Sequence, residues 1–323
     1  MEAEKMATAL GFSVGELAPG LEFGARVSGL RLEDLERDDV RKALADLWID
    51  KGVILFRGGE SSRQMQVELS RVFGTPEEFP FKESRSEEFP ELVNIKYYPE
   101  DGTAYEVDGK VIGGWIPWHT DMVYFSKLNR GGILRPHTLP AKGGGATGYA
   151  DQISAYERLP EDLKARIENL HVVYSADLNY AHARFAGDVQ IKFVRGAQSW
   201  SRIMKRIYQY PRVIHPMVFT QAETGRKVLN VSPGFAEGVY EMGGPEGDAL
   251  LQEVVSYCVD PDRTYFHDWE EDDMVLWDNW RTLHCAAGVE PDDTRLMERT
   301  TIHGDYALGQ DLDGNDKLPR FDA

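Results

Sequence analysis

Cysteine is nearly absent from this chain. Only 2 of its 323 residues are cysteines. Cys258 and Cys285 stand too far apart to form a C-x-x-C pair, which argues against a thioredoxin-like redox motif. We therefore expect two reduced thiols in a cytoplasmic protein rather than a disulfide framework.

Basic residues and long apolar runs are also scarce. The chain has 36 Lys and Arg against 54 Asp and Glu, which gives a net charge of −18. An acidic surface repels phosphate backbones and anionic lipids, so we expect no nucleic-acid partner and no membrane partner. No apolar run approaches the roughly 20 residues that span a bilayer. Residues 1–10 lack the apolar core of a signal peptide, so we expect no export signal.

Hydrophobic and aromatic residues are plentiful, at 42% and 11% of the chain, enough for a sizeable core. Many short strand candidates separated by Gly, Pro and Asp turns, with a few helices between them, predict a mixed α+β fold. We expect a double-sheet jelly roll, that is a double-stranded β-helix, with flanking helices. Because no internal repeat or linker is visible, we expect one domain over residues 1–323.

Periodicity places the main elements. A helix is expected from Asp38 to Lys51, where apolar residues recur with helical spacing, and a strand from Val53 to Phe56. A second helix begins at Ser61 or Ser62 and ends at Gly74. Further strands are expected at residues 92–98, 118–125, 131–138, 146–151, 217–219, 227–231, 265–266, 274–277 and 299–302, and helices after Pro160 and before Tyr257.

The segment 176–212 reverses the local charge. Residues 189–212 contain no Asp or Glu but six Lys and Arg, and residues 199–210 carry apolar side chains at helical spacing. Two interpretations remain open: an amphipathic surface helix with a solvated basic face, or a lid-like insertion that closes over an anionic substrate. The polar segment 309–323 is expected to be a flexible tail.

His119-x-Asp121 is the candidate for chemistry. On an extended strand this spacing puts an imidazole and a carboxylate on one face. His284, just beyond the strand 274–277, is our candidate for the third ligand. Two histidines and one carboxylate are the ligands of non-haem Fe(II) oxygenases.

Two competing assignments are less favoured. His303-x-Asp305 repeats the three-residue pattern near the end of the expected fold, and we interpret it as structural. Cys285 follows His284, but neighbouring residues on a strand point to opposite faces, so a thiolate ligand is the weaker alternative.

The spacing downstream carries a family resemblance. Arg295 follows His284 by eleven residues and Arg299 follows four residues later. This combination resembles the Fe(II)/2-oxoglutarate oxygenases of the taurine dioxygenase (TauD/TfdA) family. Segments that also resemble the family lie at residues 52–58, 73–74, 132–147, 215–216, 223–226 and 277–279, so the likeness covers nearly the whole chain.

The resemblance implies a reaction and assigns residues. His119, Asp121 and His284 would hold Fe(II), and O2 and 2-oxoglutarate would be consumed. Arg295, helped by Thr147, would bind the far carboxylate of 2-oxoglutarate, because a guanidinium matches a carboxylate with two parallel hydrogen bonds. The reaction would hydroxylate a substrate C–H bond and release succinate and CO2. An ordinary strand role remains the alternative for Thr147.

Other positions concern the substrate. Arg299 occupies the position that in similar enzymes reaches an anionic substrate group; support of the cosubstrate is the alternative. Trp115 replaces the Asn that contacts substrate in taurine dioxygenase. The segment with Phe79 lacks that enzyme's substrate His. These changes predict a more aromatic pocket and a small acid that is partly aromatic or apolar, such as an aryloxyalkanoate, hydroxylated with or without loss of the hydroxylated group.

Two other functions fit the same ligands: a non-catalytic metal-binding jelly roll, and a zinc hydrolase that would need a general base beside the metal. We expect a homo-oligomer that acts on a small molecule.

Overall fold

The largest element is an eight-stranded sheet. The computed structural model describes residues 11–78, 85–86 and 88–312. Strands follow in the order β1-β2-β3-β18-β9-β20-β4, and β5 also pairs with β20. Only β2 and β3 are parallel among these pairs. The strands are β1 (Ser13–Glu16), β2 (Ala25–Ser28), β3 (Val53–Arg57), β4 (Pro76–Glu77), β5 (Leu92–Tyr97), β9 (Gly131–Thr138), β18 (Met274–Asp278) and β20 (Arg295–Ile302).

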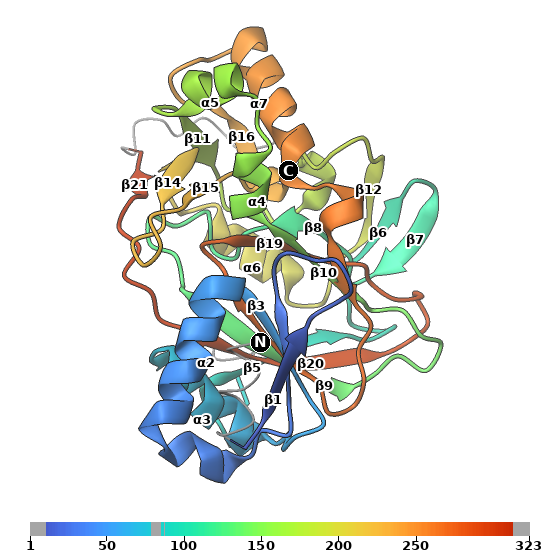
Figure 1. The fold of residues 1–323 in the computed structure, drawn as a ribbon. Coiled ribbons are helices and arrows are strands. Elements are labelled where there is room, and N and C mark those ends of the chain that lie inside the picture. Colours follow the sequence, from blue (N-terminus) through green and yellow to red (C-terminus); the bar gives the residue numbers. More distant parts are fainter. Residues whose placement is uncertain (1–10, 79–84, 87, 313–323) are drawn as a thin grey trace.

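Two helices, α2 (Asp38–Lys51) and α3 (Arg63–Phe73), cover one face of this sheet (Figure 1). Met274 and Leu276 of β18 are fully buried in one cluster with Leu44 of α2. Side chains alternate along a strand, so the residues between them face the opposite side. The large sheet therefore has a layer of helices on one face and leaves its other face to pack against a different part of the chain.

A four-stranded sheet packs on the other side, in the order β17-β10-β19-β8. Tyr149, from the second strand of that order, is buried with Val275 and Trp277 of β18. Its strands are β17 (Tyr265–His267), β10 (Thr147–Asp151), β19 (Thr282–Ala286) and β8 (Ile116–His119). The sheets are thus held face to face by an apolar layer, in a mixed fold that is mostly sheet with few helices.

A third group of elements forms the upper part of Figure 1. It joins a sheet in the order β16-β11-β13-β21 to a hairpin and three helices around a second buried cluster. Its elements are α4 (Gln152–Glu157), α5 (Glu161–Ile167), β11 (His171–Tyr174), β13 (Val213–Pro216), β14 (Val218–Thr220), β15 (Lys227–Leu229), β16 (Ala236–Val239), α7 (Pro245–Cys258) and β21 (Gln310–Asp311).

The segment 176–212 contributes one strand to a small three-stranded sheet. Its strand β12 pairs with β6, which forms a hairpin with β7. In its helix α6, Met204 and Ile207 are buried while Arg202 and Lys205 are exposed. These elements are β6 (Ala104–Val107), β7 (Lys110–Gly113), η3 (Tyr180–His182), β12 (Ile191–Arg195) and α6 (Trp200–Ile207); the other short helices are η1 (Leu32–Glu36), η4 (Pro233–Phe235) and η5 (Pro261–Arg263).

The expected helices are confirmed. Helix α2 has the expected limits, and α3 begins after Ser62, whose hydroxyl accepts a hydrogen bond from the Met65 amide at 3.0 Å. Helix α6 confirms the helical spacing within residues 199–210. None of the helices in the described part of the chain is long and apolar enough to cross a membrane.

One strand prediction is wrong. The strand expected over residues 118–125 ends at His119, and a turn follows in which Met122 has a φ of 59°. Asp121 therefore sits on the turn, not on the strand. Within the segment expected to be a tail, β21 pairs with β13, and residues 313–323 lie outside the described part of the chain.

Candidate active site

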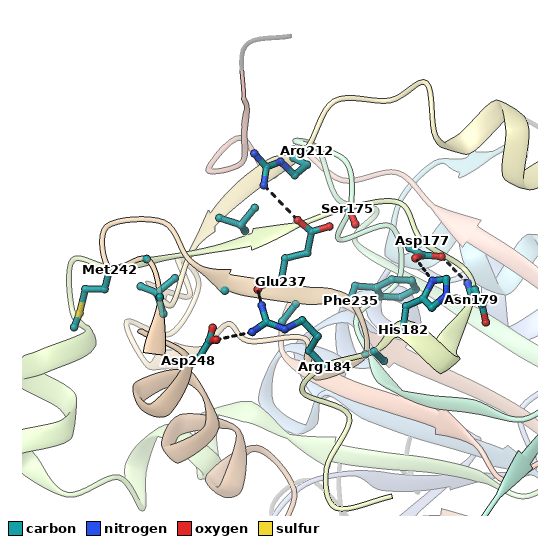
Figure 2. A pocket seen from close by; sticks show the side chains of 18 residues that line it. Ser175, Asp177, Asn179, His182, Arg184, Arg212, Phe235, Glu237, Met242 and Asp248 are labelled. Atoms are coloured by element: carbon teal, nitrogen blue, oxygen red, sulfur yellow. Dashed lines mark hydrogen bonds and ion pairs between the residues drawn. The ribbon is translucent and has the colours of Figure 1, made fainter. Parts of the chain in front are cut away.

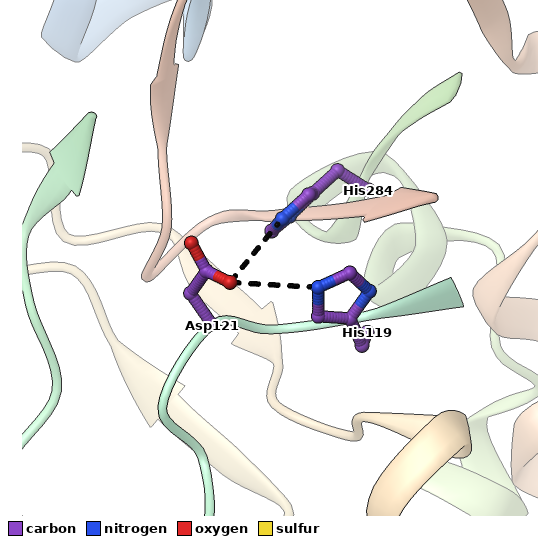
Figure 3. Close-up of side chains that lie close together, drawn as sticks. All are labelled: His119, Asp121 and His284. Atoms are coloured by element: carbon purple, nitrogen blue, oxygen red, sulfur yellow. Dashed lines mark ion pairs between the residues drawn. The ribbon is translucent and has the colours of Figure 1, made fainter. Parts of the chain in front are cut away.

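Two histidines face each other across neighbouring strands. His119 ends β8 and His284 lies in the middle of β19, and the two residues are direct partners in the antiparallel pairing. Their ring centroids are 4.2 Å apart (Figure 3). The β-ladder thus brings together imidazoles from distant parts of the chain.

Asp121 completes the group from the turn after β8. Its Oδ1 lies 3.5 Å from Nε2 of His119 and 3.6 Å from Nε2 of His284 (Figure 3). One donor atom from each of the three residues falls within 4.8 Å of the others. Within the described ranges, no other group of three or more His, Cys, Asp or Glu could hold a metal ion in this way.

The protonation of the group suits a divalent cation. Nδ1 of His119 donates to the Pro117 carbonyl at 2.8 Å, which leaves Nε2 facing Asp121. Burial, with help from neighbouring His119, lowers the pKa of His284 to about 4. Burial alone would raise the pKa of Asp121, but Arg299 and His284 hold it well below the usual range. Neutral imidazoles and an ionised carboxylate are the forms that bind Fe(II).

The turn that carries Asp121 is fastened by two side chains. Asn279 accepts the Asp121 amide proton at 2.9 Å and donates to its carbonyl at 3.0 Å. Arg299 donates to the outer oxygen Oδ2 at 2.7 Å, which leaves Oδ1 facing the histidines. In the sequence, Asn279 stands out only as part of the family-like segment 277–279. Its hydrogen bonds to Asp121 depend on how the turn folds, which no local pattern reveals.

Arg295 is buried, and no described residue forms an ion pair with it. It lies on β20 four residues before Arg299, on the same face of the strand. Its Nε and one terminal nitrogen are buried and have no hydrogen-bond partner among the described residues. Burial lowers its pKa to about 10, so the guanidinium is still charged at neutral pH. A buried, charged and unsatisfied guanidinium is a site for an anion.

Thr147 lies on β10 between two residues that adjoin Arg295. A Cβ added to Gly145 would come within 2.9 Å of Nε of Arg295. The buried Tyr149, two residues beyond Thr147 on the same face, interacts electrostatically with Arg295. Thr147 itself is buried and accepts a hydrogen bond from the indole N–H of Trp269 at 3.1 Å. Tyr149 and Trp269 were missed by sequence reasoning, since only the sheet pairing brings them here.

Aromatic rings lead from His119 to Trp115. The Phe235 ring lies 5.8 Å from the His119 ring and 5.2 Å from that of Tyr124. Tyr180, from the segment 176–212, is 6.0 Å from Phe235 and 6.4 Å from Trp115. Trp115 thus joins an aromatic wall beside the histidines. Phe79 lies outside the described residues.

A cavity of about 530 Å³ lies behind Phe235 (Figure 2). Its charged side chains are paired with one another: Arg184 donates to Asp248 at 2.5 Å, and Nδ1 of His182 lies 2.8 Å from Asp177. Phe235 lines this cavity and also contacts the His119 ring.

Cys285 and His303 have other surroundings. The Cys285 thiol is directed at Gly148, where an added Cβ would come within 2.6 Å of its sulfur, and burial raises its pKa to about 12. It is therefore a protonated thiol, not a thiolate ligand. The exposed His303 bonds to Glu77 at 2.6 Å.

The chain is similar in sequence to known proteins. The family model for taurine catabolism dioxygenase TauD, TfdA family, matches residues 13–301. The (S)-phenoxypropionate/alpha-ketoglutarate-dioxygenase of Sphingobium herbicidovorans is 32% identical over 289 residues, which cover 88% of this chain and 93% of that protein. The alpha-ketoglutarate-dependent 2,4-dichlorophenoxyacetate dioxygenase of Cupriavidus pinatubonensis is 28% identical over 88% of this chain and 96% of its own.

A solved structure agrees at the level of the fold. The crystal structure of AAD-2 with Mn(II) and N-oxalylglycine matches with a TM-score of 0.67 at 22% identity, over 91% of this chain and 97% of that one. The chain therefore belongs to the TauD, TfdA family and is a 2-oxoglutarate-dependent dioxygenase that uses Fe(II) and O2.

Proposed function

We propose that this enzyme hydroxylates an unactivated C–H bond of a small, anionic, partly aromatic acid and releases succinate and CO2. One observation carries the proposal: two histidines and a carboxylate converge, and the strand whose Arg299 binds that carboxylate also carries Arg295, a buried guanidinium with two nitrogens that lack hydrogen-bond partners among the described residues. We interpret the two face-to-face sheets as a double-stranded β-helix within a single domain. A purely metal-binding protein would have no use for Arg295 in that position.

His119, Asp121 and His284 are proposed to hold Fe(II). When bound, the metal supplies the site at which O2 is activated with the electrons of 2-oxoglutarate. Asp121 can bind the metal through Oδ1, because Arg299 occupies Oδ2. Asn279 keeps the turn in place, which fixes the third ligand relative to the two histidines.

Arg295 and Thr147 are proposed to bind the far carboxylate of 2-oxoglutarate. The buried guanidinium supports this role, since it gains a hydrogen-bonded counter-ion when a carboxylate arrives. The apolar layer between the sheets excludes water from the same region, which strengthens that ion pair.

Arg299, Trp115 and Phe79 are proposed to contact the substrate. Arg299 donates to Oδ2 of Asp121 at 2.7 Å, so its positive charge lies beside the proposed ligands, where it could attract a substrate carboxylate. The aromatic wall through Trp115 and Phe235 suits an aryl group. The names of the two relatives, a phenoxypropionate and a dichlorophenoxyacetate dioxygenase, support an aryloxyalkanoic acid. Hydroxylation next to the ether oxygen of such an acid would release a phenol.

The segment 176–212 is proposed to act as a lid. Tyr180 contributes to the aromatic wall, and the exposed basic face of α6 favours the approach of an anion. Assembly into a homo-oligomer remains our expectation and is open to measurement by light scattering.

Substrate assays test the proposal. Aryloxyalkanoates, alkyl carboxylates and sulfonates, including taurine, are compared by succinate release. The aryloxyalkanoates should be the best substrates, and their methyl esters should be at least about tenfold worse because they lack the charge that Arg299 recognises. Arg299→Gln should reduce this preference for acid over ester, and Arg166→Gln, on the surface helix α5, should preserve it. A preference for taurine, or equal turnover of acid and ester by the wild-type enzyme, would refute the proposed substrate class.

A further inference from the structure

The hydroxyl of Thr147 accepts a hydrogen bond from the indole N–H of Trp269. A hydroxyl has a single proton and two lone pairs, whereas an indole N–H can only donate. Trp269 occupies one lone pair of Thr147 at 3.1 Å, and this is the sole hydrogen bond of that hydroxyl among the described residues. The Thr147 proton is therefore left to be donated elsewhere.

The position of Thr147 indicates that an acceptor for its hydroxyl proton would lie near Arg295. Gly145 on one side and Tyr149 on the other both adjoin Arg295, whose buried nitrogens lack partners within the described part of the chain. The Tyr149 hydroxyl is likewise buried and without a described partner. Two hydroxyl donors, those of Thr147 and Tyr149, and one buried positive charge suit a carboxylate.

Trp269 is held in place from the large sheet. Its ring meets the His267 ring edge to face at 4.5 Å. His267 Nε2 lies 3.0 Å from Asp273, and Arg57 of β3 donates two hydrogen bonds of 2.6 Å to the same carboxylate. Burial would raise the pKa of Asp273, but His267 and Arg57 lower it to about 2, so the carboxylate accepts in all these bonds. Tyr265 fixes the other ring nitrogen of His267 at 2.8 Å.

We propose that Trp269 is a positioning residue of the 2-oxoglutarate site: its indole N–H turns the proton of Thr147 toward the far carboxylate of the cosubstrate. The inference rests on the proposed roles of Thr147 and Arg295. Tyr265, His267, Asp273 and Arg57 act behind it by fixing the plane of the indole. Without the indole N–H, the Thr147 hydroxyl would rotate among several orientations, and part of the binding free energy would be lost on ordering it.

The test is a comparison of ligands rather than of activity. Trp269→Phe keeps an aromatic ring and removes the N–H. Binding of 2-oxoglutarate to the Mn(II)-loaded protein is measured by calorimetry, together with pyruvate, which has the chelating 2-oxo acid but no far carboxylate. The variant should raise the Kd of 2-oxoglutarate about three- to tenfold, the effect of losing one buried hydrogen bond, and leave the Kd of pyruvate unchanged.

A second variant separates positioning from general damage. Thr147→Val should weaken 2-oxoglutarate binding by a similar factor, and adding Trp269→Phe to it should have no further effect, because the hydroxyl is already gone. Equal weakening of pyruvate, a second loss in the Thr147→Val background, or wild-type affinity in Trp269→Phe would each overturn the inference. If the wild-type protein itself fails to bind 2-oxoglutarate, the proposed function fails instead.

Discussion

Arg295 stands out among single residues because folding and function make opposite demands on it. Removing a guanidinium from water without a partner is unfavourable. Nε and a terminal nitrogen of Arg295 are nevertheless buried with no partner within the described ranges. In the proposed function, the same unsatisfied charge binds the far carboxylate of 2-oxoglutarate.

We predict that Arg295→Met stabilises the ligand-free protein while it abolishes 2-oxoglutarate binding. Removing the unsatisfied charge should raise the free energy of unfolding by about 1–3 kcal/mol, the usual cost of a buried group without partners. Thermal or urea unfolding measures this change. Arg135→Met is the matched control, since Arg135 is paired with the buried Glu298 and its loss should be destabilising. Lower stability in Arg295→Met would contradict the argument.

A second prediction concerns His284 and the second H-x-D motif, at residues 303–305. His284→Ala should eliminate the visible charge-transfer band that anaerobic Fe(II) and 2-oxoglutarate give with the wild-type protein, because two ligands remain of three. His303→Ala, in the exposed copy of the motif, should leave the band unchanged. An intact band in His284→Ala would remove His284 from the metal site.

At the scale of elements, the turn between β18 and β19 sets the position of a ligand on a different turn. Its residue Asn279 makes two hydrogen bonds to the backbone of Asp121 and two more to Asn129. A side chain outside the proposed ligand set thus determines where one proposed ligand lies.

Asn279→Ala is therefore expected to lower the affinity for Fe(II) or Mn(II) about tenfold or more, as substitutions behind metal ligands commonly do. Asn94→Ala, on β5, serves as the control. Titration of the metal-free protein with Mn(II), followed by electron paramagnetic resonance, gives the dissociation constants. Unchanged affinity would show that the turn holds Asp121 without Asn279.

The same scale explains which elements the sequence could predict. Helix α2 was predictable because its buried stripe is local: Val40, Leu44 and Trp48 recur with the helical period. The strand over 118–125 was overextended, because aromatic and β-branched residues favour a strand and the positive φ of Met122 leaves no signal in its residue type.

The candidate site divides in the same way. The proposed ligands and Arg295 could be predicted because their spacing along the chain resembles that of the family. Tyr149 and Trp269 depend on the pairing of β10 with β19 and β17, which no local pattern specifies.

For the whole molecule, two buried neutral histidines tie stability to pH. Burial lowers the pKa of both His215 and His284 to about 4, and His215 lies between the Tyr306 hydroxyl and the Phe125 carbonyl. In the unfolded chain each histidine has a pKa of about 6.5. Between these values the unfolded state binds more protons than the folded state.

We therefore expect the metal-free protein to lose stability as the pH falls from about 6.5 to 4, by at most about 1.4 kcal/mol per pH unit for each histidine. Above pH 6.5 this contribution is fully present. Urea unfolding in the presence of a chelator measures how the free energy of unfolding changes with pH. His215→Gln should reduce this slope by the contribution of one histidine. A slope that is the same in the variant would contradict the burial argument.

The pairing of His119 with His284 across β8 and β19 has a consequence for biosynthesis. His119 and Asp121 leave the ribosome long before β19 is synthesised. Contacts between such distant parts of a chain form late in folding. Iron therefore cannot template the early steps. It enters a nearly finished protein, and cells starved of iron during translation should still accumulate folded apoenzyme that later becomes active when the metal is restored.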